Sequence, residues 1–126
     1  MDCQSCIDKK ALDSLREIGG DALVVGMIEA FLGHVPHLIS EARASLASGN
    51  LEPATRTGHT LNSSARNYGS KALQDAASHL ERAARAGRTA ELPALLDEVE
   101  RVFVHVRIHL ESEADKRRTA GTAATG

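Results

Sequence analysis

The sequence has almost no aromatic residues: two Phe, one Tyr and no Trp among 126 residues. The core must therefore be built from Leu, Val, Ile and Ala, a set that suits packed helices better than a β-sandwich. The same scarcity argues against the stacking platforms with which proteins bind single-stranded nucleic acid. The net charge is −2 at pH 7, so no overall basic field attracts the chain to nucleic acid or to an anionic membrane.

Long apolar runs are also missing. The longest purely apolar runs span only a few residues, so we expect no transmembrane helix. The N-terminal MDCQSCIDKK lacks the apolar region of a signal peptide. We therefore expect a cytoplasmic protein with no membrane partner.

Cysteine is nearly absent as well. Cys3 and Cys6 form a single C-x-x-C. Without a second pair there is no zinc site of the usual spacing, and without a βαβ context there is no thioredoxin-like motif. We expect reduced thiols in a frayed N-terminal tail.

Apolar residues recur every three or four positions over five segments, the period of an amphipathic α-helix. We predict helices over about residues 8–18, 21–48, 50–68, 70–86 and 89–111. Glycines bound them, and the last four begin at the capping side chains Asp21, Asn50, Ser70 and Thr89. Pro36 is expected to kink the second of them. Short connections favour antiparallel neighbours, so the predicted fold is all-α, an antiparallel up-down four-helix bundle with a short additional N-terminal helix.

The length suits one domain. We expect residues 8–111 to form the bundle and residues 1–7 to be a flexible N-terminal tail. From about residue 112 the chain turns polar and small, so residues 112–126 are predicted to be a disordered C-terminal tail.

The stretch from His59 to Glu81 holds the residues best suited to chemistry. By the helical period, His59 lies about 100° of rotation from the inward Gly58. Its neighbours on that face are small or polar: Thr55, Asn62, Ser63 and, a further turn along, Arg66. An imidazole there is accessible, and its neutral form can use a ring nitrogen as a nucleophile. Arg66 and the Asn62 amide can donate hydrogen bonds to an added phosphoryl group.

This stretch, HTLNSSARNYGSKALQDAASHLE, resembles the histidine-containing phosphotransfer (HPt) domain of bacterial multistep phosphorelays. The family pattern is H-x-L-K-G, then small residues, a Gly ten positions after the His, and a Leu further on. His59 matches the phospho-acceptor. The other matching positions are Leu61, Ser64, Ala65, Gly69, Leu73, Leu80 and Glu81. The preceding segment, IEAFLGHVPHLISEARASLASGN, is similar to the family's helix before the His helix, and the resemblance extends over about residues 10–111.

Two positions depart from the family pattern. Asn62 stands where the family usually has Lys, and Ser63 stands where it usually has Gly. Asn supplies only a neutral donor, whereas Lys would supply a charge-assisted one, about twice as strong. We expect phosphotransfer with an altered rate or partner choice, with Arg66 as a substitute cation.

The resemblance implies that His59 accepts a phosphoryl group from a receiver-domain aspartate and passes it to another receiver domain. It implies response-regulator receiver domains as partners, with a hybrid sensor kinase as a further candidate, and a monomeric carrier. The chain would need no cofactor of its own, because the receiver supplies the magnesium. No ATP-binding motif is present in the sequence, which favours a phosphocarrier over a self-sufficient enzyme.

Other interpretations stay open. The histidine pairs His34–His37 and His105–His109 have helical spacing and raise the possibility of a zinc site, although no Glu precedes any of them by three positions. His79 is a competing acceptor, and Arg82, Arg85 and Arg88, spaced by three, form either a solvated helix face or a surface that steers an acidic receiver. The alternative function is an HPt-like interaction module that binds a receiver or kinase without carrying phosphate.

Overall fold

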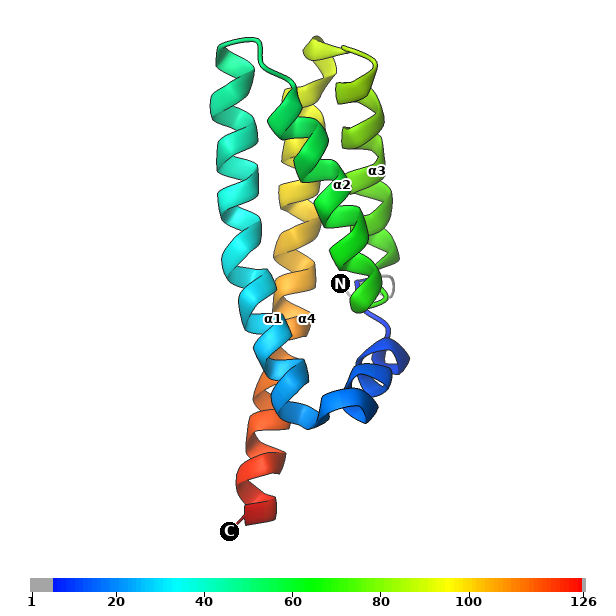
Figure 1. Cartoon of the computed structure of the whole chain (residues 1–126), viewed down its shortest axis with the longest axis vertical. Coiled ribbons are helices and arrows are strands. Elements are labelled where there is room, and N and C mark those ends of the chain that lie inside the picture. Colours follow the sequence, from blue (N-terminus) through cyan, green and yellow to red (C-terminus); the bar gives the residue numbers. More distant parts are fainter. Residues whose placement is uncertain (1–5, 126) are drawn as a thin grey trace.

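Residues 6–125 of the chain are described by a computed structural model, with side chains described to residue 120. The elements are α1 (Lys9–Ala47), α2 (Glu52–Asn67), α3 (Lys71–Arg85), the 3₁₀ turn η1 (Thr89–Glu91) and α4 (Leu92–Thr125). In Figure 1, α1 and α3 each pack against both α2 and α4. Consecutive helices run in opposite directions, which confirms the predicted all-α, up-down bundle.

Side chains cap three helix starts, and two of them, Asn50 and Ser70, are caps that the sequence predicts, whereas the predicted cap Asp21 lies inside α1. The Asp8 carboxylate accepts from the Lys10 amide at 2.9 Å, the Asn50 side chain accepts from the Glu52 amide at 3.2 Å, and the Ser70 hydroxyl accepts from the Leu73 amide at 3.4 Å. These bonds satisfy backbone donors that have no partner inside a first turn. Thr89, the predicted cap of the last helix, instead begins η1, and α4 starts at Leu92.

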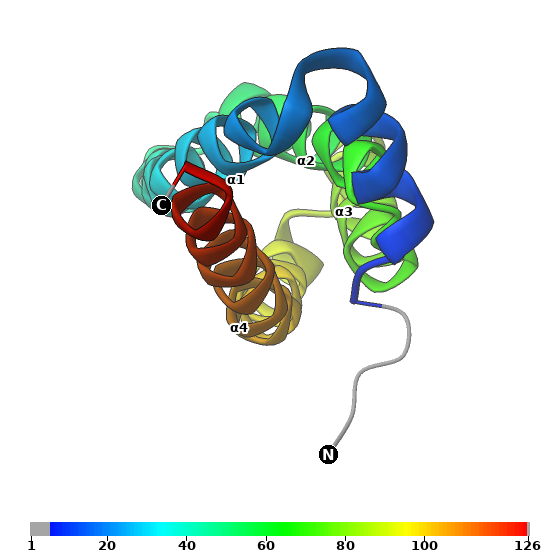
Figure 2. The same ribbon diagram turned by 90° about the horizontal axis from the view of Figure 1, so that it is seen from below.

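The kink in α1 lies at Gly20 and not at Pro36. Gly20 is the one residue inside α1 with non-helical dihedrals, φ 76° and ψ −176°, a region that side chains rarely enter. The segment before it, residues 6–20, which we call the N-terminal segment, therefore turns across the end of the bundle (Figure 2). Pro36 lies on the exposed side of α1 and keeps helical dihedrals, although its ring nitrogen has no hydrogen to donate to the Leu32 carbonyl one turn earlier.

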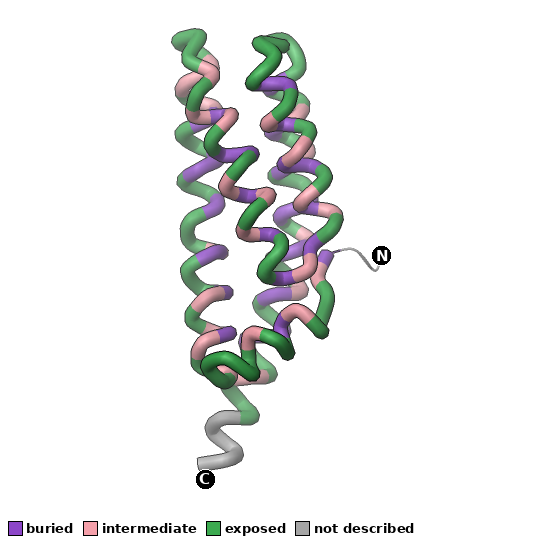
Figure 3. The backbone as a smooth tube through the Cα atoms, turned by 45° about the vertical axis from the view of Figure 1, so that its right-hand side comes forward, coloured by how far each residue is buried: buried purple, intermediate pink, exposed green. Residues whose placement is uncertain are grey.

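The core is aliphatic, as the composition requires, and buried residues line the inner faces of all four helices (Figure 3). All three aromatic rings lie together within it. The Phe31 ring lies 4.9 Å from that of Tyr68 and 6.0 Å from that of Phe103, between centroids. By length and composition alone α1 would suffice to span a membrane, but its apolar residues Val24, Ile28 and Val35 are fully buried in this core. The apolarity of α1 is therefore that of a core helix.

The predicted boundaries of the N-terminal tail are wrong. Cys6 is fully buried and Ile7 is half-buried, while residues 1–5 lie outside the described part of the chain. The Asp8 amide donates to the Tyr68 carbonyl at 2.8 Å. A Cβ on Gly69 would collide with the Asp8 Cβ, so this glycine lets the N-terminal segment contact the turn between α2 and α3.

The thiol state expected of Cys6 is also wrong. Cys6 is disulfide-bonded, and the one other cysteine in the sequence, Cys3, lies outside the described residues.

The predicted disordered C-terminal tail is likewise wrong, because α4 continues to Thr125. Glu113 and Ala114 are buried, and Arg117 is only 11% exposed. The Arg117 guanidinium donates to Asp21 of α1 at 3.0 Å and to Glu113 at 3.4 Å. The charged residues Glu113 and Arg117, which the sequence places in a solvated tail, are therefore paired with each other and with Asp21 beside the kink of α1, and these pairs attach this part of α4 to the bundle.

Tyr68 provides a direct test of this packing. Its hydroxyl donates to the Met27 carbonyl at 3.0 Å, and burial raises the pKa of Tyr68 from 10.0 to about 12. The pKa of Tyr68 is higher in the folded state, so the unfolded state releases its proton first as pH rises. The free energy of unfolding therefore falls between pH 10 and 12, by about 1.4 kcal/mol for each unit of the pKa difference. Since the sequence has one Tyr and no Trp, phenolate absorbance during an alkaline titration reports this group alone, and a midpoint near 10 in the folded protein would contradict the burial.

Candidate functional site

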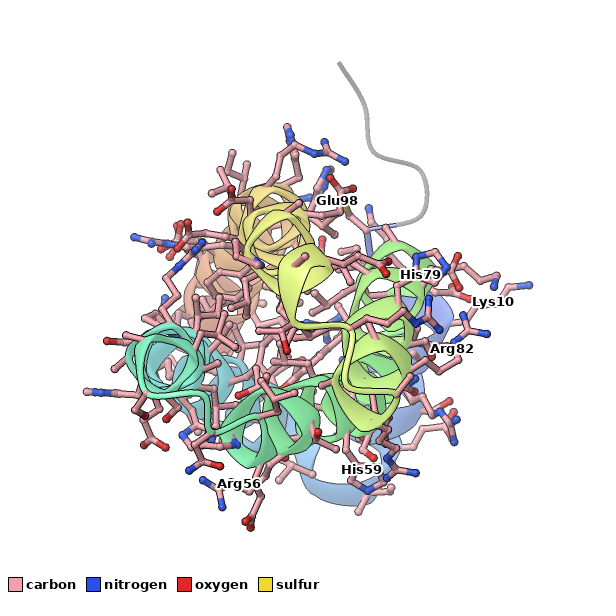
Figure 4. All side chains as sticks on the ribbon, turned by 90° about the horizontal axis from the view of Figure 1, so that it is seen from above. Lys10, Arg56, His59, His79, Arg82 and Glu98 are labelled. Atoms are coloured by element: carbon pink, nitrogen blue, oxygen red, sulfur yellow. The ribbon has the colours of Figure 1, made fainter. Side chains whose placement is uncertain are left out.

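His59 projects from the side of the bundle at the middle of α2. Its side chain is 65% exposed, and Figure 4 shows it pointing outward. The preceding two residues are buried and hold this part of α2 in place: the Thr57 hydroxyl donates to the Leu38 carbonyl of α1 at 3.1 Å, and Gly58 faces α3. A rigid backbone with an accessible imidazole is the arrangement that a nucleophile needs.

Gly58 lets α2 and α3 approach closely beside His59. A Cβ added to Gly58 would lie 2.8 Å from the Ala77 carbonyl oxygen and 2.8 Å from the Glu81 amide nitrogen. Both are backbone atoms that cannot rotate away. The hydrogen side chain of Gly58 therefore sets the distance between the two helices, and it brings Glu81 next to His59.

Glu81 is the nearest charged partner of His59. Its Oε2 lies 3.3 Å from His59 Nδ1 and 2.7 Å from an Arg85 guanidinium nitrogen. The Glu81 side chain is 16% exposed, whereas His59 and Arg85 are both more than 60% exposed. A half-sheltered carboxylate thus connects the imidazole to a cation, and the His59 nitrogen that does not face Glu81 is Nε2.

The residues that the sequence groups around His59 have different surroundings. The Asn62 amide donates to the Ser78 hydroxyl of α3 at 2.6 Å, and the Thr55 hydroxyl donates back to the Leu51 carbonyl at 3.2 Å. Ser63 and Arg66 are exposed. Arg66 is seven residues from His59, which is about 10 Å along a helix axis. One of the two donor hydrogens of the Asn62 amide is therefore engaged with α3.

Sequence reasoning did not identify Glu81 and Arg85 as partners of His59. Glu81 was noted as a position matching the resembled family, and Arg85 as one of three evenly spaced arginines. The three arginines do not share one helix face, because α3 ends at Arg85 and Arg88 lies beyond it. The available signal was the small residue Gly58 beside His59, since close helix approach needs such a position.

The competing histidines lie elsewhere. His34 and His37 are exposed on α1, His105 and His109 are half-buried on α4, and His79 is exposed on α3. Among the residues that the structure describes, no three His, Cys, Asp or Glu side chains are grouped so as to hold a metal ion.

Comparison with known proteins identifies the family of this chain. The model of the Hpt domain family matches residues 26–116. The crystal structure of histidine-containing phosphotransfer protein B (HptB) from Pseudomonas aeruginosa PAO1 is similar over 90% of this chain and 98% of that chain, with a TM-score of 0.82 and 27% sequence identity. No curated protein sequence matches. The family match covers most of the chain and includes His59, Glu81 and Arg85, so the chain belongs to the Hpt domain family, the histidine phosphotransfer proteins of phosphorelays.

Proposed function

We propose that His59 is the phospho-acceptor of this protein, and that Nε2 is the atom that carries the phosphoryl group. The observation that supports this best is the contact of Nδ1 with Glu81. A proton on Nδ1 faces the carboxylate, which leaves the lone pair of Nε2 directed to the solvent and to an approaching partner.

The donor in this proposal is an aspartyl phosphate on a receiver domain. The Nε2 lone pair attacks phosphorus in line, the N–P bond forms, and the P–O bond to the aspartate breaks, so that the aspartate leaves as a carboxylate. Positive charge develops on the imidazole as the bond forms, and the Glu81 carboxylate beside Nδ1 stabilises it. The reverse step transfers the group to a second receiver aspartate. The receiver supplies the magnesium ion, and this chain supplies a positioned nucleophile.

Arg85 is the cation that we assign to the phosphoryl group. Arg85 and His59 contact the same oxygen of Glu81, so the guanidinium lies close to the imidazole, whereas Asn62 is neutral and engaged with Ser78. A guanidinium can exchange a carboxylate for a phosphoryl oxygen at little cost, because it binds both in the same geometry. Arg85 therefore takes the part that the family's usual Lys would play at position 62.

The experiment is phosphate transfer from a panel of phosphorylated receiver domains to the purified protein. The expected product is acid-labile, base-stable phosphate on the protein, the stability pattern of a phosphohistidine. Receivers that bind the protein but transfer no phosphate would instead identify an interaction module. A cytoplasmic location is part of the same proposal, since the aspartyl phosphate must be formed from ATP in that compartment.

Glu81 gives a sharper prediction about mechanism. We expect Glu81→Ala to slow transfer to His59 about tenfold, the lower end of the loss caused by removing the carboxylate partner of a metal-bound histidine. Glu81→Gln keeps an oxygen that can accept from Nδ1, so it should keep most of the rate. Rapid-quench kinetics of label transfer measure both. Asp75→Ala, which removes an exposed acid of α3 paired with Lys71, is the matched control, and a Glu81→Ala rate equal to this control would contradict the role of Glu81.

A further inference from the structure

A second concave site lies away from His59, where α3, η1 and the start of α4 meet. Its volume is about 390 Å³, within the usual range for small-molecule sites, and its lining residues are His79, Arg82, Ala83, Arg88, Glu91 and Leu95. In Figure 4, His79 and Arg82 project from a different side of α3 than the side on which His59 lies. We call this the α3–α4 pocket; the proposed transfer at His59 does not use it.

The charge of the α3–α4 pocket is unbalanced. Arg85 pairs with Glu81 and Arg88 pairs with Glu91 at 3.7 Å, but within residues 6–120 no acidic side chain forms an ion pair with Arg82. His79 lies three positions before Arg82 on the same helix face. Two basic side chains at this spacing repel each other when the imidazole is charged. The pocket therefore has an uncompensated cation, which a bound anion would neutralise.

The walls of the pocket combine this cation with apolar surface. Ala83 is 2% exposed and Leu95 is half-buried, so both belong to the edge of the core. Glu91 is the one acid that lines the pocket, and Arg88 already offsets its charge. Two guanidinium groups beside a small apolar floor are suited to a multivalent anion, because each planar fork can bind two oxygens of one phosphate.

We propose that the α3–α4 pocket binds a small phosphorylated ligand, with its phosphate on Arg82 and Arg88 and its less polar part against Ala83 and Leu95. Phosphate is favoured over a single carboxylate because Arg82 and Arg88 both line the pocket, and one phosphate has enough oxygens to accept from both guanidinium groups. The pocket is small and concave, which favours a small molecule over a peptide laid along a helix groove.

The test is a titration of the full chain with inorganic pyrophosphate, followed by amide chemical shifts. We expect saturable shifts confined to residues 79–95. Arg82→Gln should weaken binding at least about tenfold, since a charge-assisted hydrogen bond contributes about 1.5–3 kcal/mol. Arg107→Gln, which removes an exposed arginine paired with Glu111, is the matched control and should leave the affinity unchanged.

Three results would overturn the proposal. Shifts of equal size at exposed arginines throughout the chain would show general charge screening. Equal weakening by Arg82→Gln and Arg107→Gln would show that the pocket has no part in binding. A tetraglutamate peptide that binds more tightly than pyrophosphate would show that the pocket recognises carboxylates. Arg82 is exposed, so the variant should fold, and circular dichroism of the helices verifies that it does.

Discussion

A His59→Gln variant incubated with a phosphorylated receiver domain is expected to take up no acid-labile phosphate. Glutamine approximates the size and polarity of the imidazole but offers no nucleophilic ring nitrogen. His59 is 65% exposed, and within residues 6–120 its ion pair is with Glu81, so the bundle should remain folded. We therefore expect no labelling of the variant. Its circular dichroism spectrum should be the same as that of the wild-type protein.

His79→Gln is the matched control for this result. His79 is also exposed and also on a helix, but it lies in the α3–α4 pocket and away from Glu81. Its variant should be labelled as fast as wild type. The prediction would be contradicted if His59→Gln were still labelled and the label disappeared only when His79 was replaced as well. That result would identify His79 as the acceptor.

Replacing Gly58 by alanine is expected to lower the free energy of unfolding by about 3 kcal/mol, the upper part of the usual range for an overpacked core. The new Cβ would lie 2.8 Å from two backbone atoms of α3, so the two helices must move apart. That movement also separates His59 from Glu81, and the folded fraction of Gly58→Ala should transfer phosphate more slowly than wild type. Urea denaturation and transfer kinetics measure the two effects separately.

Gly33→Ala is the control, because it makes the same chemical change in a helix with a different environment. Gly33 is exposed on α1, and nothing lies within 4 Å of an added Cβ. Alanine should stabilise α1 there by about 0.5–1 kcal/mol, since it loses less conformational entropy than glycine on folding. Two Gly→Ala variants with effects of the same sign would contradict the close approach of α2 and α3 at Gly58.

The periodicity of single segments could be predicted because it depends on local geometry. The capping side chains Asn50 and Ser70 lie where the sequence places them, and the exposed position of His59 follows from its rotation relative to Gly58. A cap or a helical stripe involves residues within about four positions of one another. The sequence pattern contains that information directly.

Contacts between helices depend on how the helix surfaces pack together, and this packing cannot be predicted from the residue pattern of one sequence. The expected tail after residue 111 is wrong for this reason. Arg117 pairs with Asp21, 96 positions away, so a polar stretch becomes part of the folded structure.

The residue pattern alone predicts a helical protein with an accessible histidine on the helix over about residues 50–68, and a resemblance to HPt domains. The charges that surround that histidine follow from the packing of the helices. Glu81 and Arg85 are 22 and 26 positions from His59, and they meet it because Gly58 has no side chain to separate α2 from α3. The distance between two helices is set by the side chains between them, so it exists only once the helices are packed.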